Sequence, residues 1–478
     1  VDADILGAVI EKFTSSDINL SPNPIYKDDA KTILKHPGLD NHGMGTIFEE
    51  LIRKFNEENN EEAGEHWTPR DVVELMADLV FVPIADKIKD ASYSCYDGAC
   101  GTGGMLTVAQ DRLLTLAKRR GKEVAIHLFG QEVQPETYAI CTADMLLKGD
   151  GEEAEHIMYG STLSDDQHAS RQFDFMLSNP PYGKSWKVDA EKMGGKKEIL
   201  DTRFNTYLEG GKLMPMIPRT SDGQLLFLLN NVSKMKKDTE LGSRIVEVHN
   251  GSSIFTGDAG SGESNARRYL IENDLVEAII ALPDKMFYNT PLNTYIWVIS
   301  NKKEDRRKGK IQLIDAMAMK KPLRKKLGDK SNELTSEFRK QILDVFLSFE
   351  ESDISHIYKN EEFGFWEVTV LRPKYQEDGS IEIDKKGNKV SDKDKTYTEI
   401  VPFTYNGGIE EYFNREILPF CDDAWIDDKK TKAGYEVSFT KCFYRPLRLR
   451  SFEEVMSELH SLEQETDGMF NEITGGIR

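Results

Sequence analysis

The chain has 478 residues, of which 39% are hydrophobic and 30% charged, and its formal net charge is −20. This length predicts two or three domains, and no apolar run approaches the roughly 18 residues that a membrane-spanning helix needs. A protein that binds nucleic acid alone usually has a basic face. The acidic balance therefore argues against strong autonomous DNA binding and leaves room for a local basic groove or a partner with a positive surface.

The cysteines and the first residues bear on compartment and metal binding. The five cysteines are scattered and form no C-x-x-C pair and no Cys/His cluster with zinc spacing, so we expect no metal site. Free thiols in a long chain indicate a reducing compartment, hence a cytoplasmic protein. Val1–Asp4 carry no basic signal region and no initiator Met, so we expect the natural amino terminus to be missing.

The first part of the chain is predicted to be helical. Ile47, Leu51 and Phe55 recur at steps of four before a polar run, as in a helix that packs on a neighbour. A further helix is predicted after residue 68, with Thr68 as its N-cap and Pro69 at its first position. An apolar stripe from Val72 to Val80 supports this helix.

A glycine-rich loop follows a short buried strand, Tyr93–Tyr96. The loop is Asp97–Gly104, and a helical pattern runs from Met105 to about Leu116. A strand, a glycine-rich loop and a helix form the first half of a nucleotide-binding unit, in which the glycines let a ligand approach the backbone. The loop is neither a Walker phosphate loop nor G-x-G-x-x-G, since Leu106 replaces the last glycine, and this lowers the odds of a dinucleotide.

The next elements predict a doubly wound sheet. A second strand, 126–132, ends in Glu132, and an acid at this place commonly binds ribose hydroxyls. Helix 135–147 and strands 156–159 and 173–178 follow, which completes a βαβαβ order. The predicted fold class is therefore α/β, with a Rossmann-like doubly wound sheet, a helical N-terminal domain and a helical C-terminal tail.

The fourth strand ends abruptly in Asn179-Pro180-Pro181-Tyr182. Neither proline can donate a ladder hydrogen bond, and each pushes the residue before it into an extended conformation. Asn179 and Tyr182 should therefore lie on a stiff loop at a strand's carboxyl end, where open α/β sheets bind ligands.

These motifs resemble a known family. Asp97–Gly104 resembles the loop of amino-methyltransferases that binds S-adenosyl-L-methionine (AdoMet), and Asn179–Tyr182 resembles their catalytic loop. Segments 255–272, 287–290, 424–427 and 434–437 narrow the resemblance to the modification (M) subunit of type I restriction–modification systems, an N6-adenine DNA methyltransferase. The motif order is that of the gamma class.

The resemblance implies AdoMet as cofactor and assigns its contacts. The implied cofactor-binding residues are Glu65, His66, Trp67, Thr68, Pro69 and Arg70 around the methionine end, Asp97 near its amino group, Gly101, Thr102, Gly103 and Gly104 along the loop, and Glu132 at the ribose. Two positions depart from the family pattern. Ser161 stands where an Asp or Asn often lies near the cofactor's adenine, and Asp144 stands where Asn is usual.

The implied catalytic residues are Asn179, Pro180, Pro181 and Tyr182. The Asn179 side-chain oxygen and the Pro180 carbonyl would accept the two hydrogens of an adenine amino group, which frees its lone pair for direct methyl transfer. Tyr182 would stack on the flipped base. No cysteine follows a proline, which argues against methylation of cytosine at C5.

The second half holds three further features. Lysine- and glycine-rich residues 184–221 are predicted as a loop, either mobile and facing DNA or merely solvated. Strands are predicted at 245–248, 276–282 and 295–300, and a polar insertion with turns at 373–395.

The C-terminus carries a heptad-like seam. Its members, at steps of three and four, are Phe452, Val455, Leu459, Leu462, Thr466, Met469 and Ile473. This helix could pack on its own domain or dock on a specificity subunit. The narrow seam favours docking.

We therefore expect four parts: a helical N-terminal domain (1–64), an AdoMet-dependent catalytic domain (65–345), an extension with a polar insertion (346–450) and a partner-docking helix (451–478). The expected partners are a specificity subunit that reads the DNA sequence, a second M subunit, a restriction subunit and double-stranded DNA, with no membrane. The alternatives are a self-sufficient N6-adenine methyltransferase, a protein-glutamine or RNA amino-methyltransferase, and an idle structural subunit.

Overall fold

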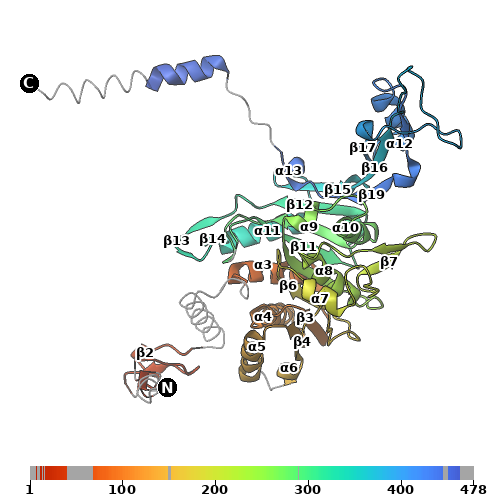
Figure 1. Cartoon of the computed structure of the whole chain (residues 1–478). Coiled ribbons are helices and arrows are strands. Elements are labelled where there is room, and N and C mark those ends of the chain that lie inside the picture. Colours follow the sequence, from red (N-terminus) through yellow and green to blue (C-terminus); the bar gives the residue numbers. More distant parts are fainter. Residues whose placement is uncertain are drawn as a thin grey trace, which may run out of the picture. The chain divides into compact units, whose positions relative to one another are not determined.

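Figure 1 shows a computed structural model of the chain, which describes residues 7, 11–12, 14–15, 17–28, 30–39, 68–148, 152–288, 290–444 and 451–462. The predicted helix at 47–55, the segment Glu65–Trp67 and the seam residues Thr466, Met469 and Ile473 lie outside these ranges. The chain divides into two units, Val1–Ser438 and Phe439–Arg478. No helix in the described ranges is both long and apolar enough to cross a membrane.

The described part of the first unit contains a nine-stranded sheet of order β15-β12-β10-β11-β9-β6-β3-β4-β5. Its strands are β3 Ala91–Asp97, β4 Val124–Glu132, β5 Ile157–Tyr159, β6 Phe175–Ser178, β9 Arg244–Asn250, β10 Val276–Ala281, β11 Thr294–Ser300, β12 Lys310–Asp315 and β15 Ser355–Lys359. Strands β11 and β15 run antiparallel to their neighbours, and the other strands share one direction. The predicted strands and the α/β doubly wound class are confirmed.

Helices cover both faces of this sheet (Figure 1). Among the described residues, the α-helices of the first unit are α3 Arg70–Phe81, α4 Gly104–Arg119, α5 Pro135–Lys148, α6 Glu152–Glu155, α7 Lys187–Lys192, α8 Gln224–Ser233, α9 Ser252–Phe255, α10 Gly262–Glu272, α11 Ser336–Ser348 and α12 Gly408–Tyr412. Helices α3, α4 and α11 share one core cluster with sheet residues such as Cys95, Phe175 and Val246. The alternate residues Tyr96 and Met176 are equally buried and point to the opposite face, as the twofold period of strands requires.

A smaller sheet follows the central one. It contains β16 Gly364–Leu371, β17 Tyr397–Pro402, β18 Trp425–Ile426 and β19 Lys432–Tyr435, with β16 paired to the other three. Between β16 and β17, the insertion 373–395 makes isolated bridges closed by turns at Gly379 and Gly387, whose φ angles are 80° and 85°. Its predicted turns are confirmed.

Two other stretches differ from the prediction. Within residues 17–39 the chain forms the antiparallel pair β1 (Ile25–Tyr26) and β2 (Leu34–His36) instead of a helix, because prolines at 22, 24 and 37 interrupt helical hydrogen bonding. Residues 184–221, predicted as a loop, contain α7 and the hairpin β7 (Asn205–Tyr207) and β8 (Leu213–Pro215). Trp186, Phe204 and Met214 form a separate small core there with α8, so this segment is packed.

The remaining elements are short. They are the 3-10 helices η2 Val82–Lys87, η3 Asp305–Arg307, η4 Asn360–Phe363, η5 Lys393–Lys395 and η7 Asp428–Lys430, the π-helix η6 Phe413–Ile417, and the hairpin β13 Lys321–Leu327 and β14 Lys330–Glu333. In the second unit, α13 spans Phe439–Cys442, and residues 452–462 are helical as predicted.

We predict that breaking the buried ion pair between β9 and β10 destabilises the fold more than removing the whole pair. Arg244 Nη2 lies 2.8 Å from Glu277 Oε2, and both side chains are 3% exposed. Glu277→Gln or Arg244→Met should each cost about 3–5 kcal/mol because one buried charge is left unpaired. The double variant Arg244→Met/Glu277→Leu should cost less than either, as measured by urea unfolding.

The half-exposed pair of Arg306 and Glu304 provides the control, since their side chains are 48% and 39% exposed. Glu304→Gln should change the free energy of unfolding by at most about 1 kcal/mol. The coupling would be contradicted if the double variant at Arg244 and Glu277 lost as much unfolding free energy as the two single variants together.

Candidate active site

A cavity of about 330 Å³ opens where β3, β4, β5 and β6 end. Parallel strands end at the same edge of a sheet, and the loops that follow them converge there. The loops 98–102, 133–134, 160–163 and 179–182 line the cavity. Its volume lies within the usual range of small-molecule sites.

The glycine-rich loop between β3 and α4 has two backbone positions in the left-handed region. Gly101 has a φ angle of 55°, and Gly103, which precedes α4, has a φ angle of 82°. A Cβ on Gly103 would lie 2.6 Å from the Met145 side chain and 2.8 Å from Cys141 Sγ on α5. Gly101, Thr102 and Gly104 line the cavity, whereas Gly103 provides the close packing of the loop against α5.

Glu132 ends β4 with its carboxylate fixed at the cavity wall. Its Oε2 accepts a hydrogen bond from the Gly101 amide (3.0 Å), and its Oε1 accepts one from the Gln134 amide (2.8 Å). The residue is 7% exposed and lines the cavity. Each carboxylate oxygen can accept more than one hydrogen bond, so Glu132 retains acceptors for two ligand hydroxyls.

Asp97 ends β3 and is buried at the cavity wall. Its carboxylate accepts hydrogen bonds from the Ala99 amide (3.0 Å) and from Ser178 Oγ (2.7 Å). Burial raises the pKa of Asp97 to about 7. Such a carboxyl group gains strongly from a cationic ligand. Sequence reasoning missed Ser178, although a small polar residue at the end of an apolar strand was a usable signal.

Asn179 is held by Thr68, which lies two residues before α3. Its Nδ2 donates to Thr68 Oγ1 at 2.9 Å. Its Oδ1 is buried and has no hydrogen-bond partner within the described ranges, and Asn179 is one of the residues that line the cavity. A buried acceptor without a partner is costly, so this oxygen is poised for a ligand donor.

The predicted N-cap role of Thr68 is wrong by one residue. Helix α3 starts at Arg70, Pro69 precedes it as the cap residue, and the Pro69 carbonyl accepts the amides of Val72 and Val73. The Thr68 hydroxyl is engaged by Asn179 and makes no cap hydrogen bond. Thr68 and Arg70 line the cavity, and Pro69 is buried behind them.

Aromatic side chains form another wall of the cavity. Tyr182, Trp186 and Phe227 all line it. The Tyr182 hydroxyl is buried without a partner among the described residues, and burial raises its pKa. Trp186 is fixed by its indole N–H, which donates to the Arg219 carbonyl at 2.9 Å. Pro180 and Pro181 line the cavity beside them.

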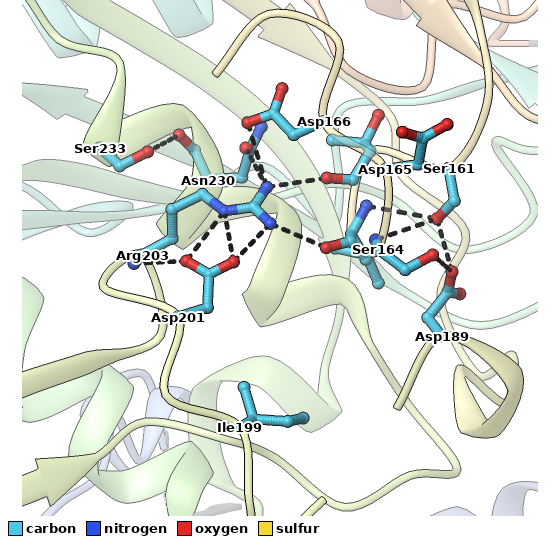
Figure 2. Close-up of polar contacts among 12 residues, drawn as sticks. Ser161, Ser164, Asp165, Asp166, Asp189, Ile199, Asp201, Arg203, Asn230 and Ser233 are labelled. Carbon is cyan, nitrogen blue, oxygen red and sulfur yellow. Dashed lines mark hydrogen bonds and ion pairs between the residues drawn. The ribbon is translucent and has the colours of Figure 1, made fainter. Parts of the chain in front are cut away.

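A carboxylate from α7 reaches the end of β5. Asp189 Oδ1 accepts hydrogen bonds from the hydroxyls of Ser161 and Ser164, both at 2.6 Å (Figure 2). Asp189 lines the cavity, so an acidic group stands beside Ser161 after all. Sequence reasoning missed it because Asp189 is 28 residues away along the chain.

Arg203 fixes the loop that holds Ser161. Its guanidinium donates to the carbonyls of Thr162 (2.8 Å) and Leu163 (2.7 Å) and pairs with Asp201 and Asp166, as Figure 2 shows. No local pattern pointed to this arginine.

Within the described ranges, no group of three or more His, Cys, Asp or Glu side chains is placed to hold a metal ion. Of the predicted cofactor residues, Glu65, His66 and Trp67 lie outside the described residues.

Comparison with known sequences identifies the family. The profile of the N-6 DNA methylase family matches residues 39–369. The chain belongs to this family. Relatives include the type I restriction enzyme MjaIX methylase subunit of Methanocaldococcus jannaschii, which is 29% identical over 69% of this chain and 52% of its own length. The MpnII methylase subunit of Mycoplasma pneumoniae is 28% identical over 78% of this chain and 61% of its own length.

This chain thus matches about half to three fifths of the length of these two relatives. Among solved structures, a type I restriction–modification methyltransferase subunit from Streptococcus thermophilus matches with a TM-score of 0.52 and 23% identity, over 68% of this chain and 60% of that one. This likeness supports the same class of fold.

We predict that Asp97→Asn stabilises the ligand-free protein increasingly as the pH rises from 5.5 to 8. The folded-state pKa of Asp97 is raised to about 7, so the stability that its protonated form contributes is lost as the pH rises from the unfolded-state value through 7. The stability difference between variant and wild type should grow by on the order of 2 kcal/mol over this range. Urea unfolding at both pH values measures it.

The exposed Asp238 supplies the control. Asp238→Asn should change the unfolding free energy by the same small amount at both pH values. A pH-independent effect of Asp97→Asn would show that Asp97 is ionised in the folded protein throughout this range.

Proposed function

We propose that the chain is the modification subunit of a type I restriction–modification enzyme and transfers a methyl group from AdoMet to the exocyclic nitrogen of an adenine in DNA. The observation that carries the proposal is the unpartnered, buried Asn179 Oδ1 at the wall of the cavity. Its relatives named as type I methylase subunits support the same assignment.

Asn179 is set to act as an acceptor. Since its Nδ2 donates to Thr68, its Oδ1 is the atom left to accept a hydrogen bond from a ligand. An adenine amino group has two hydrogens to donate, and the Pro180 backbone carbonyl, on the same loop, takes the second in this proposal. Hydrogen bonds to both hydrogens favour a tetrahedral nitrogen and concentrate its lone pair, so positioning and electrostatics supply the catalysis.

The residues that line the other end of the cavity fit AdoMet. Asp97 would meet its ammonium group, the loop Gly101, Thr102 and Gly104 would lie along it, and Glu132 would take the two ribose hydroxyls. Asp189, fixed by two serine hydroxyls, is the acceptor available near the base end. When bound, AdoMet supplies an electrophilic methyl group on a sulfonium.

No side chain needs to form a covalent intermediate. Cys100 is the cysteine at the cavity wall, and its hydrogen bond with the Cys141 thiol and its burial raise its pKa, so the thiol stays protonated. Tyr182, with Trp186 and Phe227 nearby, offers an aromatic surface to a base that has left the duplex. These features suit direct transfer to a flipped adenine.

The exposed apolar side chains of the helix at 452–462 support the proposal that this chain binds a partner subunit. Its apolar side chains Phe452, Leu459 and Leu462 are 79%, 51% and 58% exposed. A specificity subunit with a complementary helix would cover them, together with the rest of the predicted seam, and would supply the DNA sequence recognition that an acidic chain lacks.

We predict that Asn179→Ala abolishes methyl transfer and leaves AdoMet affinity within about two-fold of wild type, since the acceptor contacts the base rather than the cofactor. Thr68→Val should lower kcat about ten-fold, because the loss of a hydrogen bond of roughly 1.4 kcal/mol lets the amide reorient. Single-turnover methylation of adenine-containing DNA measures the rate of methyl transfer by both variants. Full activity of Asn179→Ala would refute the proposed mechanism.

We predict that removal of residues 451–478 prevents assembly with the specificity subunit. AdoMet binding should persist, because the cavity belongs to the first unit and the deleted segment to the second. Co-expression followed by size-exclusion chromatography measures assembly, and calorimetry measures cofactor binding. The substitution Phe452→Ser/Leu459→Ser should weaken assembly in the same direction. Normal assembly of the truncated chain would contradict the docking role.

A further inference from the structure

We propose that the β13–β14 hairpin binds the phosphate backbone of the DNA duplex beside the flipped adenine, an inference that rests on the function proposed above. Sequence analysis did not single out this hairpin. Its charge, its place at the sheet edge and its anchoring each point to this role.

The charge of the hairpin is opposite to that of the chain. The stretch 320–327 contains Lys320, Lys321, Arg324, Lys325 and Lys326 and no acidic residue, in a chain of net charge −20. Lys320 pairs with Asp284 and Lys321 with Glu333. Among the described residues, no acidic group lies within ion-pair distance of the other three, and all three are exposed.

Strand pairing pushes these three cations outward. Lys321 pairs with Glu333, and Pro322 with Asn332, but the next paired position is Leu327 with Lys330. Residues 323–326 therefore face Ser331 alone and form a bulge in β13. A bulge leaves its extra residues unpaired and bends the strand, and Arg324, Lys325 and Lys326 are exposed.

The hairpin leaves the sheet at the edge that carries the active site. Strand β12 is parallel to β10, which shares its direction with β6 through the two antiparallel pairs of β11. The segment after Asp315 therefore starts at the same edge as Asn179. Strand β12 lies four strand positions from β6, which is about 19 Å at the usual strand spacing. This is roughly half a turn of B-DNA.

Strand β14 of the hairpin is held by helix α3 and by the loop after β10. Lys330 Nζ lies 3.3 Å from both carboxylate oxygens of Asp71 and donates to the Met286 carbonyl at 3.0 Å. Asp71 also accepts the Leu334 amide at 2.7 Å. Asp71 stands three residues after Thr68, the partner of Asn179. The hairpin and the catalytic asparagine thus share one helix start as their support.

The turn of the hairpin is also seated on this edge. Gly328 has a φ angle of 60°, and a Cβ there would lie 2.6 Å from the Tyr288 carbonyl in the loop after β10. The Asp329 amide donates to the same carbonyl at 2.9 Å. A rigid, basic, exposed strand beside a site for a flipped base suits the backbone of a duplex, which carries one negative charge per roughly 1.7 Å.

The test is the salt dependence of DNA binding by the complete enzyme, with the chain assembled with its natural partner subunits. We expect Arg324→Gln/Lys325→Gln/Lys326→Gln to reduce the slope of log affinity against log salt concentration by about two to three, since each phosphate contact contributes about 0.9. Affinity for a duplex that contains the target site should fall at least about ten-fold at 100 mM salt. AdoMet affinity and Tm should be unchanged.

Two controls separate position from net charge. Lys385→Gln/Lys386→Gln/Lys393→Gln removes the same charge from exposed positions of the 373–395 insertion and should keep the wild-type slope. Arg324→Lys/Lys325→Arg/Lys326→Arg keeps the charge and should also keep it.

An unchanged slope for the hairpin variant would overturn the inference. Loss of subunit assembly by the hairpin variant would also overturn it and would assign the hairpin to an acidic protein surface instead. Failure of the proposed function is distinguishable, because the wild-type enzyme would then methylate no adenine under any salt condition.

Discussion

Both halves of the candidate active site depend on one buried hydrogen bond, from the Ser178 hydroxyl to the Asp97 carboxylate. Asp97 ends β3 and Ser178 ends the neighbouring strand β6, so the bond fixes the starting points of the glycine-rich loop and of the Asn-Pro-Pro-Tyr loop relative to each other. The carboxylate is desolvated, and its pKa is raised to about 7. Asp97 is therefore unfavourable as an anion in the empty cavity and gains most when a cationic group enters. The free-energy cost of burying this charge therefore arises at a position where a bound cationic group can offset it.

The start of α3 links the candidate active site to the surface. Thr68 orients the Asn179 amide, and Asp71, in the first turn, holds the buried Lys330 of the hairpin. The prolines before and after these contacts limit the backbone freedom of both loops: Pro69 precedes the helix and Pro180 follows the asparagine. A helix start that is fixed on two sides can hold a hydrogen bond within the narrow geometry that transfer chemistry requires.

The sequence predicted what depends on local pattern. Strand alternation, the glycine-rich loop and the acid after β4 predicted a ligand site that includes Glu132, and the family resemblance assigned Asp97 and Thr102 to it. All three residues line the cavity. The contacts that were missed are long-range. Asp189 meets Ser161 because the fold brings α7 to the loop after β5, and Arg203 reaches carbonyls about forty residues earlier. Residues 184–221 were predicted as a loop because lysines and glycines outnumber the few apolar residues that form their core.

Under the proposed function, the distribution of charge explains how an acidic chain could act on DNA. At about 0.1 M salt the Debye length is about 10 Å, so most of the net charge of −20 is screened from any one surface point. What a nearby phosphate experiences is the local field, and along β13 this field is positive. Under the proposed function, screened repulsion from the rest of the chain and attraction close to β13 would give weak capture of random DNA. Under the proposed function, a duplex then reaches the cavity mainly when a partner that reads its sequence has already bound it.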